Sequence, residues 1–171
     1  MIGNDVIDLI QSRQESNWQR KGYLAKIFTP EEQILIAENS DPEIMVWILW
    51  SMKEAAYKIY HRKTKIREYI PKKLECTLLT QGTNFILGQV QCGENLYYTK
   101  TELSQESLHS IAVSYLENLN NVVEIKNKTI FKDQYGIPYL TGVSQTLKEV
   151  SVSHHGRFKK IVSIMSANIT E

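Results

Sequence analysis

A change from helix-forming to strand-forming sequence patterns near residue 74 most constrains the fold of this 171-residue chain. Helix signals dominate before it. After it come short segments rich in β-branched and aromatic residues, separated by Gly, Asn, Pro and Lys. They predict strands over 74–79, 84–91, 96–102, 108–116, 129–133, 149–154 and 160–165. Helices first and strands after predict an α+β fold, with helices packed on a mostly antiparallel sheet. The length fits a single domain over residues 1–171.

Two helices with clear start signals precede this boundary. Thr29 and Glu32 have the spacing of a capping box around a proline, which predicts a helix over 30–39. Asp41 stands before another proline and is the expected N-cap of a helix over 42–60.

The second of these helices carries "WSMKEAAYKIY", in which Glu54 and Lys58 are one helical turn apart and therefore lie side by side. Such a pair is commonly a solvated surface salt bridge, and that interpretation stays open. The apolar side chains between Trp47 and Ile59, however, leave little of this helix for water. A carboxylate on a mostly buried helix needs a cation or a metal as its partner. Glu54 is therefore a candidate metal ligand.

A pair of carboxylates lies in the short, β-like N-terminal segment "MIGNDVIDLI". On a strand, Asp5 and Asp8 point to opposite faces because their separation is odd. At most one of them is then expected beside Glu54. The alternative is that Asp5 caps a turn after Gly-Asn, and that Asp8 begins the following helix.

The segment "VSVSHHGRF" near the C-terminus predicts a strand that ends in two histidines. Ser151, Ser153 and His155 alternate there with Val152 and His154. A strand end that opens into a loop is a common place for ligand binding. An exposed histidine pair at a turn is the alternative. No third His or Cys stands nearby in the sequence, which argues against zinc.

These three segments together resemble the signature of the 4'-phosphopantetheinyl transferases, which is a GxD segment, a W-x-x-K-E-A-x-x-K helix and an S-x-S-H strand. The chain reads "GNDVIDL", "WSMKEAAYK" and "VSVSH", with "FTPEE" and "DQYGIPYL" as further matches. GxD comes first and S-H last, an order similar to that of the small holo-acyl-carrier-protein synthases. The resemblance implies the fold of that family.

The resemblance also implies a reaction. Coenzyme A would donate 4'-phosphopantetheine to a serine of an apo acyl- or peptidyl-carrier protein, leaving adenosine 3',5'-bisphosphate. Asp5 and Glu54 would hold Mg²⁺, and Glu54 and Lys58 would act in catalysis. Lys58, Ser153 and His154 would bind coenzyme A. The carrier could serve fatty acid, polyketide or peptide biosynthesis.

In the same way, the resemblance implies a homo-oligomer. The small synthases are trimers in which each site lies between subunits. His154 of one chain is therefore expected near Asp5 and Glu54 of the next. The alternative is that the strands from about 84 to 132 build a partial second lobe, so that a monomer can work.

Two other functions compete with the transferase. Residues 58–73 contain seven Lys or Arg and one acid, a pattern that also suits nucleic acid. The net charge of only +1 makes nucleic acid the weaker expectation. An inactive relative is the other alternative, because Asn4 and the basic run 157–160 depart from the family pattern.

The sequence also bears on location. The N-terminus has no basic segment of the kind that begins a signal peptide. The longest apolar run, "IMVWILW", is too short to span a membrane. A cytoplasmic protein is therefore expected.

Overall fold

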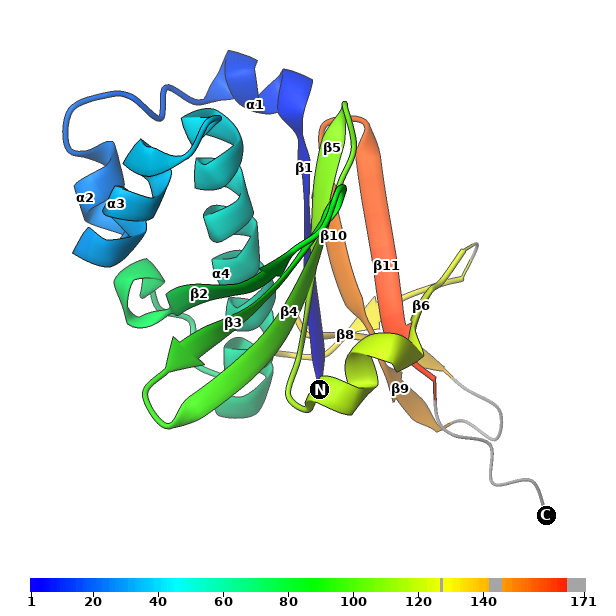
Figure 1. Ribbon diagram of the computed structural model, residues 1–171. Coiled ribbons are helices and arrows are strands. Elements are labelled where there is room, and N and C mark those ends of the chain that lie inside the picture. The colour runs from blue at the N-terminus through cyan, green and yellow to red at the C-terminus, as the bar shows by residue number, and fades with distance from the viewer. Residues whose placement is uncertain (127, 142–145, 166–171) are drawn as a thin grey trace.

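The structure is a computed structural model that describes residues 1–126, 128–141 and 146–165 (Figure 1). Its helices are α1 (Leu9–Glu15), α2 (Tyr23–Ile27), α3 (Pro30–Glu38) and α4 (Pro42–Thr64), with short 3-10 turns η1 (Pro71–Lys73) and η2 (Leu116–Asn121). Its strands are β1 (Ile2–Asp8), β2 (Glu75–Gln81), β3 (Phe85–Cys92), β4 (Asn95–Leu103), β5 (Ser107–Val113), β6 (Val122–Glu124), β7 (Phe131–Lys132), β8 (Pro138–Thr141), β9 (Leu147–Glu149), β10 (Ser151–His155) and β11 (Phe158–Ile164).

The strands form three antiparallel sheets. The largest has the order β1-β5-β4-β3-β2, so the first strand of the chain pairs with the fifth. A second sheet has the order β10-β11-β6 and a third the order β7-β8-β9. The α+β architecture with antiparallel sheets is the fold class expected from the sequence.

The predicted helix starts are confirmed. Thr29 Oγ1 accepts from the backbone N–H of Glu32, whose side chain accepts from Thr29 N, completing the capping box of α3. Asp41 caps α4 through Ile44 N. The α4 helix continues one turn beyond the predicted end and stops at Lys65, whose φ of 62° is left-handed.

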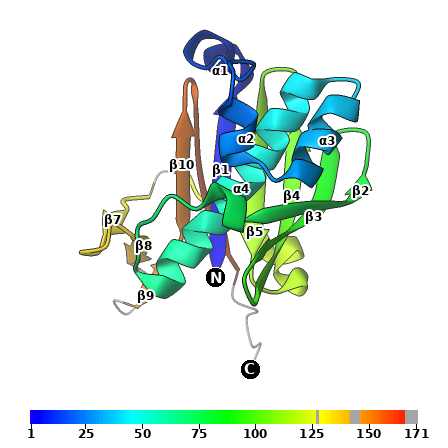
Figure 2. The same cartoon turned by 90° about the vertical axis from the view of Figure 1, so that its left-hand side faces the viewer.

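The helix α4 lies along one face of the five-stranded sheet, and β10 and β11 flank β1 (Figure 2). The main hydrophobic core fills the space between α4 and this sheet. Its fully buried members on the helix include Val46, Leu49, Met52 and Ile59. No described helix is both long and apolar enough to cross a bilayer.

The predicted strands differ from the observed ones mainly after residue 120. The segment expected over 129–133 pairs only at Phe131–Lys132. The segment expected over 149–154 is divided, because Leu147–Glu149 pairs with β8 while β10 pairs with β11. The fully buried Val150 separates the two strands.

Candidate active site

The GxD segment and the helix motif meet at a close contact between Gly3 and Ala55. A Cβ atom at Gly3 would lie 1.9 Å from the Ala55 carbonyl oxygen, so only glycine fits there. Ala55 and Ala56 are themselves fully buried. The small residues let β1 approach α4, and this brings Asp5 near Glu54, the residue just before Ala55.

The two carboxylates influence each other. Burial and the neighbouring Asp5 charge raise the pKa of Glu54 from 4.5 to about 7. Burial also raises the pKa of Asp5, although Lys58 and the Ser153 hydroxyl act against this. Two carboxylates held together in a partly dry site disfavour their own ionised forms, which a cation would reverse. This donor set fits Mg²⁺, which takes oxygen ligands and commonly only one or two carboxylates.

Lys58 joins α4 to two strands. Its Nζ donates to Asn4 O of β1 (2.5 Å) and to Val152 O of β10 (3.2 Å), and it lies 3.7 Å from Asp5 Oδ1. The side chain is 31% exposed, so part of the ammonium group faces solvent. Lys58 therefore holds the strands together at the point where it could also contact an anion.

The strand β10 binds β1 through side-chain hydrogen bonds and not through the backbone-to-backbone hydrogen bonds of a sheet. Ser151 Oγ accepts from Asn4 N (2.9 Å), Ser153 Oγ from Val6 N (2.9 Å), and His155 Nδ1 from Asp8 N (2.9 Å). Three alternate side chains of β10 thus occupy the free edge of β1. Sequence reasoning noted their alternation but not this role, because the edge they cover lies nearly 150 residues away in the chain.

This arrangement brings the S-H segment to the carboxylates of its own chain. Ser153 Oγ donates to Asp5 Oδ1 (3.0 Å), and His154 lines one pocket together with Asp5 and Glu54. The sequence-based expectation was that a neighbouring subunit supplies His154. Within this one chain, the hydrogen bonds between β1 and β10 already bring His154 to that pocket, and contacts between subunits are not tested.

Two pockets meet at His154. The acidic pocket, of about 280 Å³, is lined by Asp5, Glu15, Tyr23, Trp47, Trp50, Glu54, His154 and His155 among others. The basic pocket, of about 440 Å³, is lined by Lys58, His61, Arg62, Arg67, Lys132 and His154 together with apolar residues such as Ile137. The described lining of the basic pocket includes no Asp or Glu.

The basic pocket contains polar groups with unused hydrogen-bonding capacity. Arg62 is 6% exposed, and its Nη2 donates to Pro138 O and Val150 O. Arg62 Nη1 and His61 Nε2 are buried and have no hydrogen-bond partner among the described residues. Burial lowers the pKa of His61. These groups were not singled out as site residues from sequence, although Arg62 belongs to the basic run that was noted.

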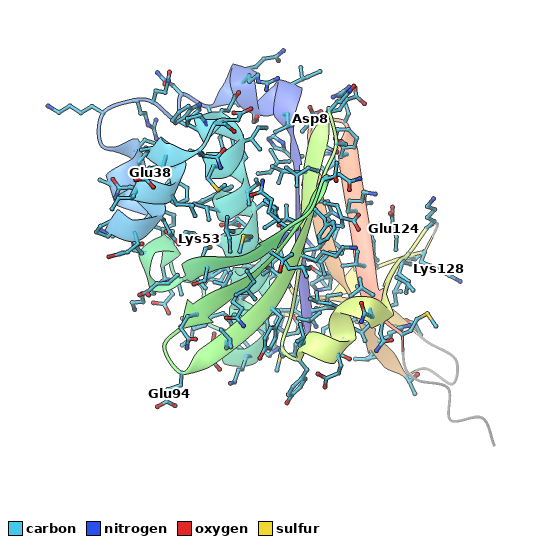
Figure 3. The ribbon with its side chains drawn as sticks, viewed as in Figure 1. Asp8, Glu38, Lys53, Glu94, Glu124 and Lys128 are labelled. Atoms are coloured by element: carbon cyan, nitrogen blue, oxygen red, sulfur yellow. The ribbon has the colours of Figure 1, made fainter. Side chains whose placement is uncertain are left out.

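The other residues of the motifs have structural roles. Lys53 Nζ forms a fully buried ion pair with Glu32 (2.7 Å) and donates to Pro71 O (2.8 Å) and to Leu74 O. Figure 3 shows Lys53 inside the molecule, whereas Glu94 projects from the β3–β4 turn. The lysine of the K-E pair thus neutralises Glu32, the second glutamate of "FTPEE".

Asp8 lies on the opposite face of β1 from Asp5, as the odd spacing predicted. It caps α1 by accepting from Ile10 N, and it forms a two-point ion pair with Arg157. The hydrogen bond from Arg157 holds the pKa of Asp8 well below its usual range. Gly156, with φ of 52°, packs so closely that a Cβ would lie 2.5 Å from Asp8 Oδ2. Arg157, a departure from the family pattern, thus fixes the β10–β11 turn.

Asn4, the other departure, is fully buried. Its Nδ2 lies 3.1 Å from His109 Nε2 and donates to Lys160 O (3.3 Å). The polar side chain in GxD therefore connects β1 to β5 and β11, away from the carboxylate pair.

The chain matches the sequence model of a known protein family. The model of the 4'-phosphopantetheinyl transferase superfamily matches residues 1–115. The chain belongs to this superfamily. The match covers the GxD segment and the helix motif of the phosphopantetheinyl transferases, and the S-H strand at Ser151–His155 lies beyond it.

One curated relative is also similar. It is described as "Putative structural protein VP1" of Aedes pseudoscutellaris reovirus (isolate France), and it is 29% identical over 83 residues. The match covers 46% of this phosphopantetheinyl transferase-family chain and only 7% of the viral protein.

Proposed function

We propose that this chain transfers 4'-phosphopantetheine from coenzyme A to a serine of an acyl- or peptidyl-carrier protein, as a holo-acyl-carrier-protein synthase does. The observation that carries the proposal is the Asp5–Glu54 pair, with both pKa values raised, beside Lys58 and His154. Superfamily membership supports the same reaction class. The proposal takes residues 1–171 as one domain, because β10 near the C-terminus completes the site formed by β1 and α4.

In this proposal Asp5 and Glu54 hold Mg²⁺. The metal, when bound, supplies positive charge that clamps phosphate oxygens and stabilises the negative charge of the leaving group. The carboxylates themselves gain from it, since a cation removes the repulsion that raises their pKa values.

The substrate lies across the junction of the two pockets. The nucleotide end of coenzyme A carries phosphate charge and enters the basic pocket, where Arg62 Nη1 and His61 Nε2 have unused capacity. Lys58 and His154 face the pyrophosphate, because both line the basic pocket near the carboxylates.

The chemical step exchanges one phosphorus–oxygen bond for another. The serine oxygen of the carrier attacks the phosphorus that bears the pantetheine arm, and the bond to the nucleotide's phosphate breaks. Glu54 accepts the serine proton. A carboxylate has two oxygens, so Glu54 can share the cation through one and receive the proton on the other. Lys58 stabilises the charge that develops on the departing phosphate.

Two finer points belong to the same proposal. A homotrimer remains the proposed assembly, and in this proposal His154 comes from the chain's own β10, which lines the pocket of Asp5 and Glu54. Binding of nucleic acid by residues 58–73 is disfavoured, since Arg62 is buried and Lys65 and Arg67 contact the segment 133–136.

Calorimetric titration tests the proposal. Coenzyme A should bind the wild-type protein more tightly with Mg²⁺ than with EDTA, and the metal effect should vanish in Asp5→Asn. Lys159→Ala, a change of an exposed lysine outside both pockets, serves as the control. Binding that is equal in Mg²⁺ and EDTA would contradict the metal assignment.

A further inference from the structure

The indole N–H of Trp47 is a buried donor without an acceptor. Trp47 lies on α4, is 4% exposed and lines the acidic pocket. Its Nε1 makes no hydrogen bond within the described residues. Buried donors are nearly always paired in folded proteins, because an unpaired one loses its hydrogen bond to water. A ligand whose acceptor reaches Nε1 from this pocket would satisfy the group.

The charge of the acidic pocket limits what that ligand can be. Its described lining includes no Lys or Arg, and three carboxylates face it, from Asp5, Glu15 and Glu54. A phosphate group would be repelled everywhere except beside a cation held by Asp5 and Glu54. The rest of the described lining combines the aromatic Tyr23, Trp47 and Trp50 with two histidines, two serines, Val6 and Ile7. An uncharged chain that carries carbonyl acceptors fits this surface.

The two pockets together fix the direction of the substrate. His154 lines both, and Lys58 of the basic pocket lies 3.7 Å from Asp5 of the acidic pocket. A pyrophosphate at this junction has its nucleotide on the basic side. The pantetheine arm, which is neutral and contains two amide groups, then extends into the acidic pocket toward Trp47.

We propose that Trp47 Nε1–H donates a hydrogen bond to an amide carbonyl of the pantetheine arm and thereby orients coenzyme A in the site. This inference rests on the proposed function, since it requires coenzyme A to bind. It assigns to Trp47 the recognition of the transferred group, separately from the groups that hold the nucleotide.

Indole signals in a ¹⁵N-labelled protein test the contact without any mutation in the measured sample. The chain has three tryptophans, and Trp47→Phe assigns the signal of interest. We expect coenzyme A with Mg²⁺ to move the Trp47 N–H proton signal downfield, as gain of a hydrogen bond does. Adenosine 3',5'-bisphosphate, which lacks the arm, should leave it in place. An unmoved signal with coenzyme A, or an equal movement with both ligands, would overturn the inference.

Affinity provides the second measurement. Trp47→Phe removes the N–H and keeps an aromatic ring, so coenzyme A should bind roughly fivefold more weakly, the loss of about one neutral hydrogen bond. Adenosine 3',5'-bisphosphate should bind with unchanged affinity. The control is Trp18→Phe, the same change at a partly buried residue outside the described lining of the acidic pocket.

The outcomes separate the two proposals. If the wild-type protein binds neither ligand, the proposed function fails and this inference fails with it. If coenzyme A binds wild-type and Trp47→Phe equally well, only the inference fails. The inference is also wrong if Trp47→Phe raises only the KM for the carrier protein, because Trp47 would then contact the carrier.

Discussion

The Ser153 hydroxyl donates to Asp5 Oδ1 across 3.0 Å while it accepts from the backbone N–H of Val6 across 2.9 Å. One small side chain of β10 thus fixes both the edge of β1 and the orientation of a proposed metal ligand. Ser151, two residues before Ser153, accepts an equivalent hydrogen bond from the backbone N–H of Asn4. No hydrogen bond between Ser151 and a carboxylate is found among the described residues.

This difference predicts unequal effects of two matched substitutions. Ser153→Ala and Ser151→Ala each remove one strand contact, so their melting temperatures should fall by similar amounts. Only Ser153→Ala releases Asp5, and partners of a metal ligand typically affect metal affinity by roughly tenfold or more. Titration of Mg²⁺ in the transfer assay measures this. Equal Mg²⁺ dependence in the two variants would show that Ser153 does not orient Asp5.

The buried Lys53–Glu32 pair should matter for stability and not for substrate. Lys53→Met leaves the Glu32 carboxylate without its cation in the core, a loss of about 3–5 kcal/mol in the free energy of unfolding. Urea denaturation measures this, and the exposed Lys72→Met is the control. Coenzyme A affinity of the folded variant should be unchanged. A stable variant with weak coenzyme A binding would instead place Lys53 at a phosphate.

The pKa of Glu54 predicts how the metal-free protein responds to pH. Folding raises this pKa from 4.5 to about 7, so the folded state favours the protonated form. The contribution of Glu54 to stability is therefore fully present below about pH 4.5 and is lost as the pH rises through 7, a change of up to roughly 3 kcal/mol. The raised pKa of Asp5 acts in the same direction.

The Glu54→Gln variant has no carboxyl group to ionise at this position. Its unfolding free energy, measured in EDTA by urea titration, should therefore decline less as the pH rises from about 4.5 through 7. Mg²⁺ at pH 7.5 should stabilise the wild-type protein and have little effect on the variant. Parallel pH profiles in EDTA would contradict the burial of Glu54 beside Asp5.

Lys58 should contribute to both stability and binding. Its hydrogen bonds to Asn4 O and Val152 O join β1 to β10, but its partial exposure reduces the stability that they contribute. Lys58→Met should cost about 1–2 kcal/mol of stability and weaken coenzyme A binding in calorimetry. The control is Lys63→Met, an exposed lysine five residues further along α4 that contacts Asn95. Unchanged binding would leave Lys58 a structural residue only.

The placement of His154 predicts the result of a mixing experiment. Because β10 brings His154 to Asp5 and Glu54 of the same chain, an Asp5→Ala chain and a His154→Ala chain should not restore activity when they are refolded together. Transfer assays on the mixture and its parts measure this. Recovery of activity would show that the site is shared between subunits.

Local signals made much of this structure predictable. The capping box at Thr29 and the cap at Asp41 depend on residues a few positions apart, and both helices begin where expected. The odd spacing of Asp5 and Asp8 correctly placed them on opposite faces. Both predictions use geometry that a short stretch of chain determines by itself.

The parts that were missed depend on contacts between distant segments. The sequence pattern does not show that Ser151, Ser153 and His155 cover the free edge of β1, because the two segments are far apart in the chain. The burial of Lys53 was also missed, because its partner Glu32 is on another helix. In the sequence, Lys53 and Lys58 look alike, and only the packing of α4 separates the core lysine from the lysine of the proposed site.

The most direct test of the central claim is an intact-mass measurement on carrier proteins. A panel of apo carriers of the fatty-acid, polyketide and peptide-synthetase types is incubated with coenzyme A, Mg²⁺ and this protein. At least one carrier should gain the mass of one phosphopantetheine group, and Asp5→Ala and Glu54→Gln should reduce that gain sharply. If no carrier gains mass while the protein is folded and binds coenzyme A, the chain is not a phosphopantetheinyl transferase for these carriers. Full activity in EDTA would contradict the proposed mechanism.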